Sequence, residues 1–200
     1  MGRRRCRGII DERVRDSIMT IKEIKWDNND KLEIEIVLSV ENLWKIKFPK
    51  NYVNLISQHD SANPLLKDKN GEWEYGIIDI PNWHGKATEF GFISYTTAKY
   101  FNTLSIIHFY EALKDRLPEP DKIFPFASTG SGDILFFDYR KNPDEPAIVF
   151  MDHEEAFTEE DITQAELKEK PVKEWLEMNL FPVCNSFSEL LDLLYIDEED

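Results

Sequence analysis

One run of the chain combines the side chains that metal binding or acid–base catalysis requires. Asp152-His153-Glu154-Glu155 follows a short apolar segment, Ala147–Met151, that has the composition of a β-strand. If the strand continues, Asp152 and Glu154 point to one face, and His153 and Glu155 point to the other. Four ligands divided in this way do not converge on one ion. The sequence therefore predicts a solvated strand end that faces a partner; a small hydrolase built on Asp152 and His153 is a distant alternative.

Two other patterns could do chemistry, and both have simpler explanations. Gly130-Ser131-Gly132 could cradle a phosphate, but it lacks the rest of a dinucleotide fingerprint and the lysine of a P-loop, so a tight turn is favoured. His59, His84 and His108 have no Ser or Cys nucleophile in a recognisable setting, so no triad can be assembled. We expect a protein that is not an enzyme, with no catalytic residues, no cofactor and no metal.

The charge of the chain is strongly negative and unevenly placed. The formal net charge is −15, and residues 141–200 hold 18 acidic and 4 basic residues. Phosphate binding needs clustered Lys and Arg, so direct binding of nucleic acid is disfavoured. An acidic surface attracts a basic protein partner instead. That the acids only keep the protein soluble is an equally good alternative.

The candidate partner-binding residues are one tryptophan and seven acidic residues, and the acidic ones lie near the ends of predicted strands between residues 123 and 151. Trp83, in the short polar loop Asn82–Gly85, is the best candidate for an exposed aromatic anchor, although a tryptophan is more often part of a core. The acidic candidates are Asp133, Asp138, Asp144, Glu145, Asp152, Glu154 and Glu155.

Three short strands joined by turns are predicted between residues 123 and 151. The segments 123–127, 134–139 and 147–151 are apolar, and glycines or Asn142-Pro143 separate them. Parallel neighbours would need a longer crossover, so an antiparallel meander is expected. Side chains alternate between the two faces of each strand, and the C-terminal helix must cover one such face. The sequence therefore predicts one core, which contains Phe126, Ile134, Phe136, Ile148, Phe150, Leu190 and Leu194.

The rest of the chain predicts helices and a few more strands. Helices are expected from an Asp30–Glu33 capping box to Trp44, over 50–58, over 103–116 with Leu104, Ile107, Tyr110 and Leu113 on one stripe, over much of 158–178, and over 187–195 after a Ser186–Glu189 capping box. Strands are expected over 71–81 and 90–95. Residues 1–18 are expected to be a basic, poorly ordered tail, and 19–200 a single domain.

Four segments, in order, resemble the SUKH superfamily of Smi/Knr-like proteins. They are FPKNYVNLISQHD (48–60), FPFASTGSGDILFFDYR (124–140), PAIVFMDHEE (146–155) and NSFSELLDLLY (185–195). The usual Asn-Gly-Gly after the first helices is replaced by Asp60–Pro64, and 158–178 is longer than the usual connection. The resemblance implies an α+β fold with a mixed, largely antiparallel sheet flanked by N-terminal and C-terminal helices.

The same resemblance implies a function. Most bacterial members are immunity proteins that neutralise polymorphic toxins, frequently nucleases, whereas fungal relatives are scaffolds in cell-wall regulation. We therefore expect an immunity protein with a cognate toxin partner; an intracellular scaffold that binds a signalling partner is the alternative. The chain has two cysteines, no secretory signal peptide and no apolar run of membrane-spanning length, so a cytoplasmic location is expected.

Overall fold

A central antiparallel sheet organises the chain. The computed structural model describes residues 22–84, 86–95 and 105–197. Its five-stranded sheet has the order β10-β9-β8-β7-β6. The middle three strands are the predicted meander, with β7 at Ile123–Ser128, β8 at Ile134–Asp138 and β9 at Ala147–Met151. Short turns join these strands, and every pair in the sheet is antiparallel.

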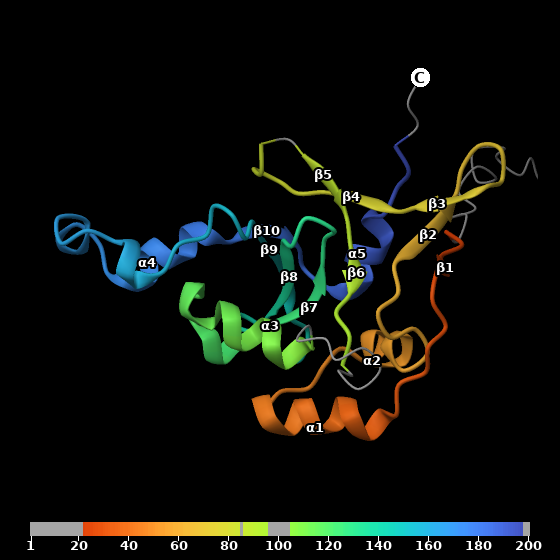
Figure 1. The fold of residues 1–200 in the computed structure, drawn as a ribbon, viewed down its shortest axis with the longest axis horizontal. Coiled ribbons are helices and arrows are strands. Elements are labelled where there is room, and N and C mark those ends of the chain that lie inside the picture. Colours follow the sequence, from red (N-terminus) through yellow and green to blue (C-terminus); the bar gives the residue numbers. More distant parts are fainter. Residues whose placement is uncertain (1–21, 85, 96–104, 198–200) are drawn as a thin grey trace, which may run out of the picture.

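Smaller sheets and helices surround this sheet (Figure 1). The remaining strands are β1 Lys25–Trp26, β2 Pro64–Lys67, β3 Trp73–Tyr75, β4 Ile77–Asp79, β5 Ala87–Glu89, β6 Gly91–Phe92 and β10 Phe181–Cys184. The helices are α1 Ile34–Trp44, α2 Lys50–Ile56, α3 Ile106–Leu113, α4 Val172–Leu176 and α5 Phe187–Leu193. Strands β1–β3 form a second sheet, and β4–β5 form a hairpin. The predicted α+β fold is confirmed. None of the helices in the described residues is long and apolar enough to cross a membrane.

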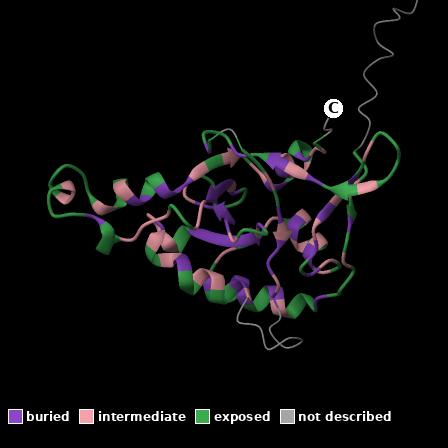
Figure 2. Cartoon of the chain, turned by 45° about the horizontal axis from the view of Figure 1, so that its top comes forward, coloured by how far each residue is buried: buried purple, intermediate pink, exposed green. Residues whose placement is uncertain are grey.

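The core lies on both faces of β8. Phe137 pairs with Ile148 on one face, and Phe136 pairs with Val149 on the other. On the first face Phe137 contacts Tyr52 of α2 and Phe187 of α5, with ring centroids 5.1 and 6.0 Å apart. Figure 2 shows the central strands as continuously buried. All seven predicted core residues, Phe126, Ile134, Phe136, Ile148, Phe150, Leu190 and Leu194, are at most 1% exposed.

The two predicted capping boxes have different outcomes. Helix α1 begins at Ile34 with Glu33 as N-cap, and no side chain caps it, so the Asp30 capping box is wrong. The preceding chain is held instead by main-chain hydrogen bonds, from the Asp60 amide to Asp30 and from the Leu32 amide to Ser57. At α5 the Ser186 hydroxyl does accept from the Glu189 amide, at 3.1 Å.

Other strands and helices also differ from their predicted bounds. The predicted strand 71–81 divides at Gly76, where the chain leaves the second sheet for the hairpin, and Ala87–Glu89, between the predicted loop and the predicted strand 90–95, forms a strand of its own. In α3, Ile106 is buried and Ile107 is 38% exposed, so the predicted stripe is wrong at Ile107; residues 103 and 104 lie outside the described residues.

The segment 158–178 is mostly short 3-10 turns rather than helix. Helix α4 is only five residues long, and 3-10 turns occupy 159–161, 166–168 and 177–179. The Thr158 and Thr163 hydroxyls donate to Asp161 and Glu166, which closes single turns at these positions. The proposed tail, 1–18, falls outside the described residues.

Candidate functional site

The acidic run at the end of β9 is a turn, not a strand. The carboxylate of Asp152 accepts hydrogen bonds from the amides of Glu154 and Glu155, at 2.9 and 3.2 Å. An aspartate that binds the amides ahead of it competes with strand pairing and favours a turn. The predicted alternation of these side chains on two faces is therefore wrong, and Glu154 and Glu155 are both exposed.

A second turn, between β7 and β8, is tied to this one through a buried carboxylate. Asp133 is 4% exposed and accepts from Ser131 Oγ at 2.8 Å and Thr129 Oγ1 at 3.2 Å. Its other oxygen accepts from the amide of His153 at 3.1 Å and from His153 Nδ1 at 2.9 Å. Gly132, at φ 104°, lies so close that an added Cβ would be 3.4 Å from the His153 ring.

The electrostatics of this link favour the charged carboxylate. Burial by itself raises the pKa of Asp133, but hydrogen bonds from His153, Ser131 and Thr129 outweigh it, and the pKa is lower than usual. Potential ligand atoms of Asp133, Asp152 and His153 lie within 4.8 Å of one another, the one such group among the described residues. Both carboxylates already accept several protein donors, so the geometry is that of a hydrogen-bonded junction between two turns.

Trp83 is part of this junction rather than an exposed anchor. Its side chain is 7% exposed, and its ring packs on Phe150 with centroids 4.6 Å apart. The indole Nε1 donates to the second oxygen of Asp152 at 2.9 Å. The loop residue that reaches the surface is His84, whose Nε2 lies 3.5 Å from the Glu155 carboxylate. The expectation of an exposed Trp83 is thus wrong, because the hairpin tip folds back onto the sheet.

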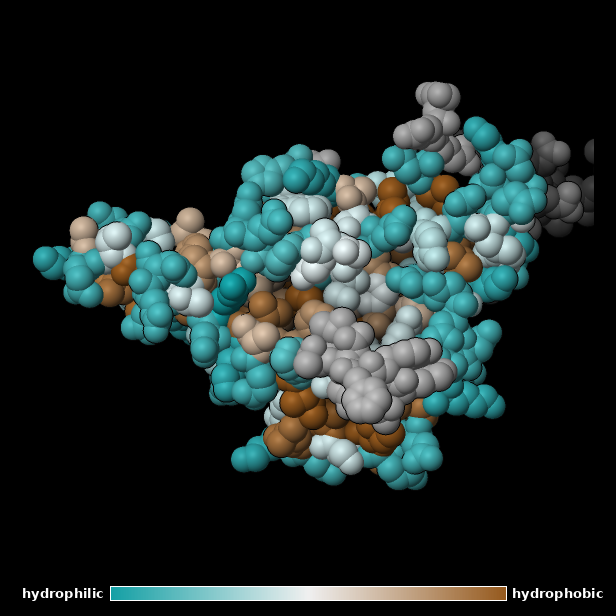
Figure 3. Space-filling model, viewed as in Figure 1, coloured by the Kyte–Doolittle hydropathy of each residue, from teal (hydrophilic) through white to brown (hydrophobic). Residues whose placement is uncertain are grey.

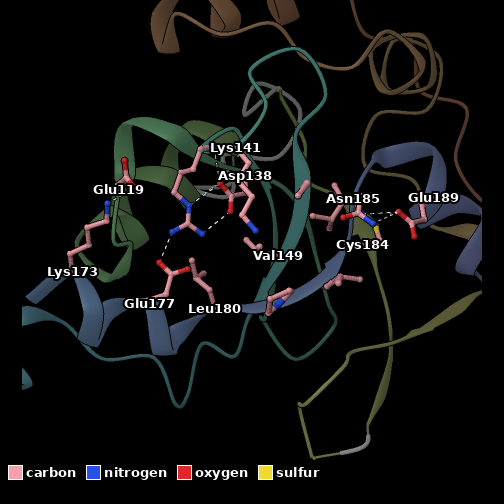
Figure 4. Close-up of a pocket in the computed structure, with 15 residues that line it drawn as sticks. Glu119, Asp138, Lys141, Val149, Lys173, Glu177, Leu180, Cys184, Asn185 and Glu189 are labelled. Carbon is pink, nitrogen blue, oxygen red and sulfur yellow. Dashed lines mark hydrogen bonds and ion pairs between the residues drawn. The ribbon is translucent and has the colours of Figure 1, made fainter. Parts of the chain in front are cut away.

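Asp138 lies in a cleft of about 440 Å³ over β9 and β10, where it is buried (Figure 4). It binds Arg140 through two hydrogen bonds, at 2.9 and 2.7 Å, and Glu177 binds the same guanidinium. At the other end of the cleft, Glu189 accepts from the amide and side chain of Asn185. These polar groups satisfy one another, so the cleft offers few free groups to a ligand.

The remaining acidic candidates lie at the opposite end of β9 from the turn. Asp144 and Glu145 belong to the exposed β8–β9 connection, where only their amides are bound, by Asn142. Five strand residues separate them from Asp152, which at about 3.3 Å per residue is roughly 17 Å. The structure therefore divides the seven acidic candidates between two ends of the meander.

Comparison with known families identifies the superfamily. The family model described as SMI1-KNR4 cell-wall (SUKH_6) matches residues 34–167, about two thirds of the chain. This chain is a SUKH protein. The match includes the meander and the Asp133–His153 junction, whereas β10 and α5 lie beyond it. A search of curated proteins found no match.

Sequence reasoning missed the partners of the junction. The sequence predicts the turn but not the hydrogen bonds from Thr129 and Ser131 to Asp133, although hydroxyls four and two residues before an aspartate can bind it in a turn. The contact between Trp83 and Asp152 joins residues 69 positions apart, and no local pattern indicates it.

Proposed function

We propose that this SUKH protein is an immunity protein that binds a cognate toxin and neutralises it by occluding its active site. Members of the superfamily are generally immunity or regulatory proteins rather than enzymes, and the family match is the observation that carries the proposal. A cytoplasmic location, and a single domain over residues 19–200 that follows a basic tail, belong to the same proposal.

The exposed acids support a mechanism by competition. Asp144, Glu145 and Glu154 are exposed, and their carboxylates have no ion pair or hydrogen bond in the described residues. A nuclease toxin needs a basic cleft for its substrate, so such carboxylates attract that cleft and compete for it. The inhibitor needs no catalytic group for this purpose.

Partner capture separates this function from the scaffold alternative. Purified protein is used to capture partners from a lysate of the source cell, and the bound chain is identified by mass spectrometry. A bound chain that is toxic when expressed alone and harmless when expressed with this protein supports the proposal. Capture of a non-toxic signalling protein, without any protective effect, contradicts it and favours a scaffold.

Charge reversal then tests the acidic surface. We expect Glu154→Lys with Glu155→Lys, and separately Asp144→Lys with Glu145→Lys, to slow association with the toxin in stopped-flow experiments. For the pair that faces the toxin, the association rate constant should fall about tenfold or more at low salt. Added salt should shrink the difference from wild type, because exposed charges are screened.

The matched control is Glu159→Lys with Glu160→Lys, another adjacent exposed pair whose carboxylates have no hydrogen bond or ion pair in the described residues. Asp161 and Glu166 are unsuitable as controls because they hold the side chains of Thr158 and Thr163. Equal losses for all three pairs would mean that only total charge matters.

A further inference from the structure

We propose that a hollow beside the C-terminal segment binds an arginine side chain presented by a protein partner. The hollow has a volume of about 370 Å³ and lies at the base of the β4–β5 hairpin. Its apolar floor is Ile77 and Ile196, and Tyr75 is its exposed aromatic wall. We call it the Tyr75 hollow; its lining is completed by Asp68, Lys69, Glu74, Glu89 and Asp197.

Three separate parts of the chain build this surface. The β2–β3 turn and β3 supply one wall, and the paired strands β4 and β5 supply Ile77 opposite Glu89. The C-terminal segment is fixed against β4 by two main-chain hydrogen bonds between Ile77 and Tyr195, at 2.8 and 2.9 Å. The Tyr195 hydroxyl also donates to Asp79 at 2.7 Å. The pairing of Tyr195 with β4 therefore fixes the positions of the next two residues, Ile196 and Asp197.

Three carboxylates of the Tyr75 hollow lack a partner among the residues that the structure describes. The carboxylates of Glu74, Glu89 and Asp197 have no ion pair or hydrogen bond in the described residues, and Lys69 is the one cation in the lining. The larger cleft of Figure 4 differs in this respect, because Asp138, Arg140 and Glu177 pair with one another. Of the two, the smaller hollow is the one that attracts a cation.

The apolar groups select the kind of cation. Tyr75 is 47% exposed, and Figure 3 shows hydrophobic residues near β3 and β4, at the upper right, surrounded by hydrophilic ones. A guanidinium stacks on an aromatic face, binds carboxylates through paired N–H groups and is weakly hydrated, whereas an ammonium is a strongly hydrated point charge. The aliphatic stem of an arginine would cover the isoleucine floor.

This inference deepens the proposed function, because it assigns an arginine-bearing segment of the basic partner to a specific place on the surface. The Tyr75 hollow does not include the acids at the ends of β9. Its binding of arginine can be tested with a peptide, without the toxin.

The test is an NMR titration of the isotope-labelled full chain with a blocked Gly-Arg-Gly tripeptide. The lysine analogue and the neutral citrulline analogue serve as comparison ligands. We expect the arginine peptide to shift the amide signals of Tyr75, Ile77 and Ile196. The lysine peptide should bind about threefold more weakly, and citrulline should produce no saturable shift.

Variants make the result specific. Tyr75→Thr combined with Glu89→Gln should weaken arginine binding about three- to tenfold, whereas Tyr75→Phe, which keeps the ring, should preserve it. Glu160→Gln alone, which removes one negative charge as the test variant does, is the charge-matched control and should change nothing. Equal binding of the lysine and arginine peptides, shifts spread over all acidic segments, or no shift at the hollow would overturn the proposal.

The toxin gives a second readout that keeps the two proposals separate. If Tyr75→Thr with Glu89→Gln leaves the affinity for a neutralised toxin unchanged, the role of the Tyr75 hollow in recognition is refuted and the immunity function stands. If the wild-type protein protects against no toxin, the immunity function fails, and the peptide titration still decides whether the hollow binds arginine.

Discussion

Replacing Asp133 should destabilise the protein strongly, because this carboxylate joins the two turns at one end of the meander. Asp133→Ala removes the acceptor of four hydrogen bonds, from Thr129, Ser131 and two groups of His153. Ser131 is exposed and the His153 side chain is 35% exposed, so water can replace part of what is lost there. Thr129 is buried, and its hydroxyl would lose an acceptor inside the protein.

The expected loss in the free energy of unfolding follows from how far each of these groups is exposed to water. Hydrogen bonds to a charged group contribute about 1.5–3 kcal/mol each, and a buried donor left unsatisfied costs about 1–3 kcal/mol, but rehydration offsets part of the sum. We expect Asp133→Ala to lower the free energy of unfolding by about 2–4 kcal/mol. Asp133→Asn, which keeps one oxygen acceptor and the shape, should cost about 1–2 kcal/mol.

The stability that Asp133 contributes should decrease as the pH falls. Because the folded-state pKa of Asp133 is lowered, its contribution is complete above the unfolded value of about 3.9 and is lost as the pH falls through the folded value. Urea unfolding of wild type and both variants, from pH 7 down to pH 3, measures the effect. A loss below about 1 kcal/mol for Asp133→Ala at pH 7, or a difference from wild type that does not shrink in acid, would refute the reasoning.

Three further predictions concern other parts of the chain. Phe136→Ala, at a fully buried position of β8, should lower the free energy of unfolding by about 3–5 kcal/mol in urea; a loss under about 1 kcal/mol would contradict the core assignment. The pKa of Glu119 is lowered to about 2, chiefly by hydrogen bonds from Lys122 and Lys173, so NMR titration should place its midpoint there, and Lys173→Met should raise it; an unchanged midpoint would argue against the contact between Glu119 and α4. Burial raises the pKa of Cys184 to about 12, so in a Cys6→Ser variant its thiol should react with Ellman's reagent at pH 8 only after denaturation, and rapid reaction of the folded protein would contradict its burial.

The fold could be predicted where the sequence carries a strong local signal. The meander was predictable because apolar runs alternate with Gly- and Pro-containing turns, and α5 because Ser186 and an apolar stripe mark its start and its buried face. The segment 158–178 misled the prediction because a charged composition suits both a helix and a chain of single turns. There the Thr158–Asp161 and Thr163–Glu166 contacts close local turns instead.

The candidate surface was less predictable, because burial of a polar group depends on partners that are distant in sequence. Asp138 and Asp152 look as available as Asp144 in the sequence, but Arg140, which also binds Glu177, pairs with the first, and Trp83 binds the second. The Tyr75 hollow combines residues 68 and 197, and neither segment alone suggests a site.

The acidic charge that is free for recognition is therefore smaller and more localised than the composition suggests. Asp133, Asp138 and Asp152 hold the structure together, which leaves Asp144 and Glu145 at one end of β9 and Glu154 and Glu155 at the other. The second pair adjoins the hairpin tip through His84. The Tyr75 hollow lies at the base of the same hairpin, at Ile77 and Glu89. One partner surface could thus reach both, whereas Asp144 and Glu145 lie beyond the length of β9. If the hairpin side is the interface, reversal of Glu154 and Glu155 should slow toxin association more than reversal of Asp144 and Glu145. The opposite order would place the interface at the other end of the sheet.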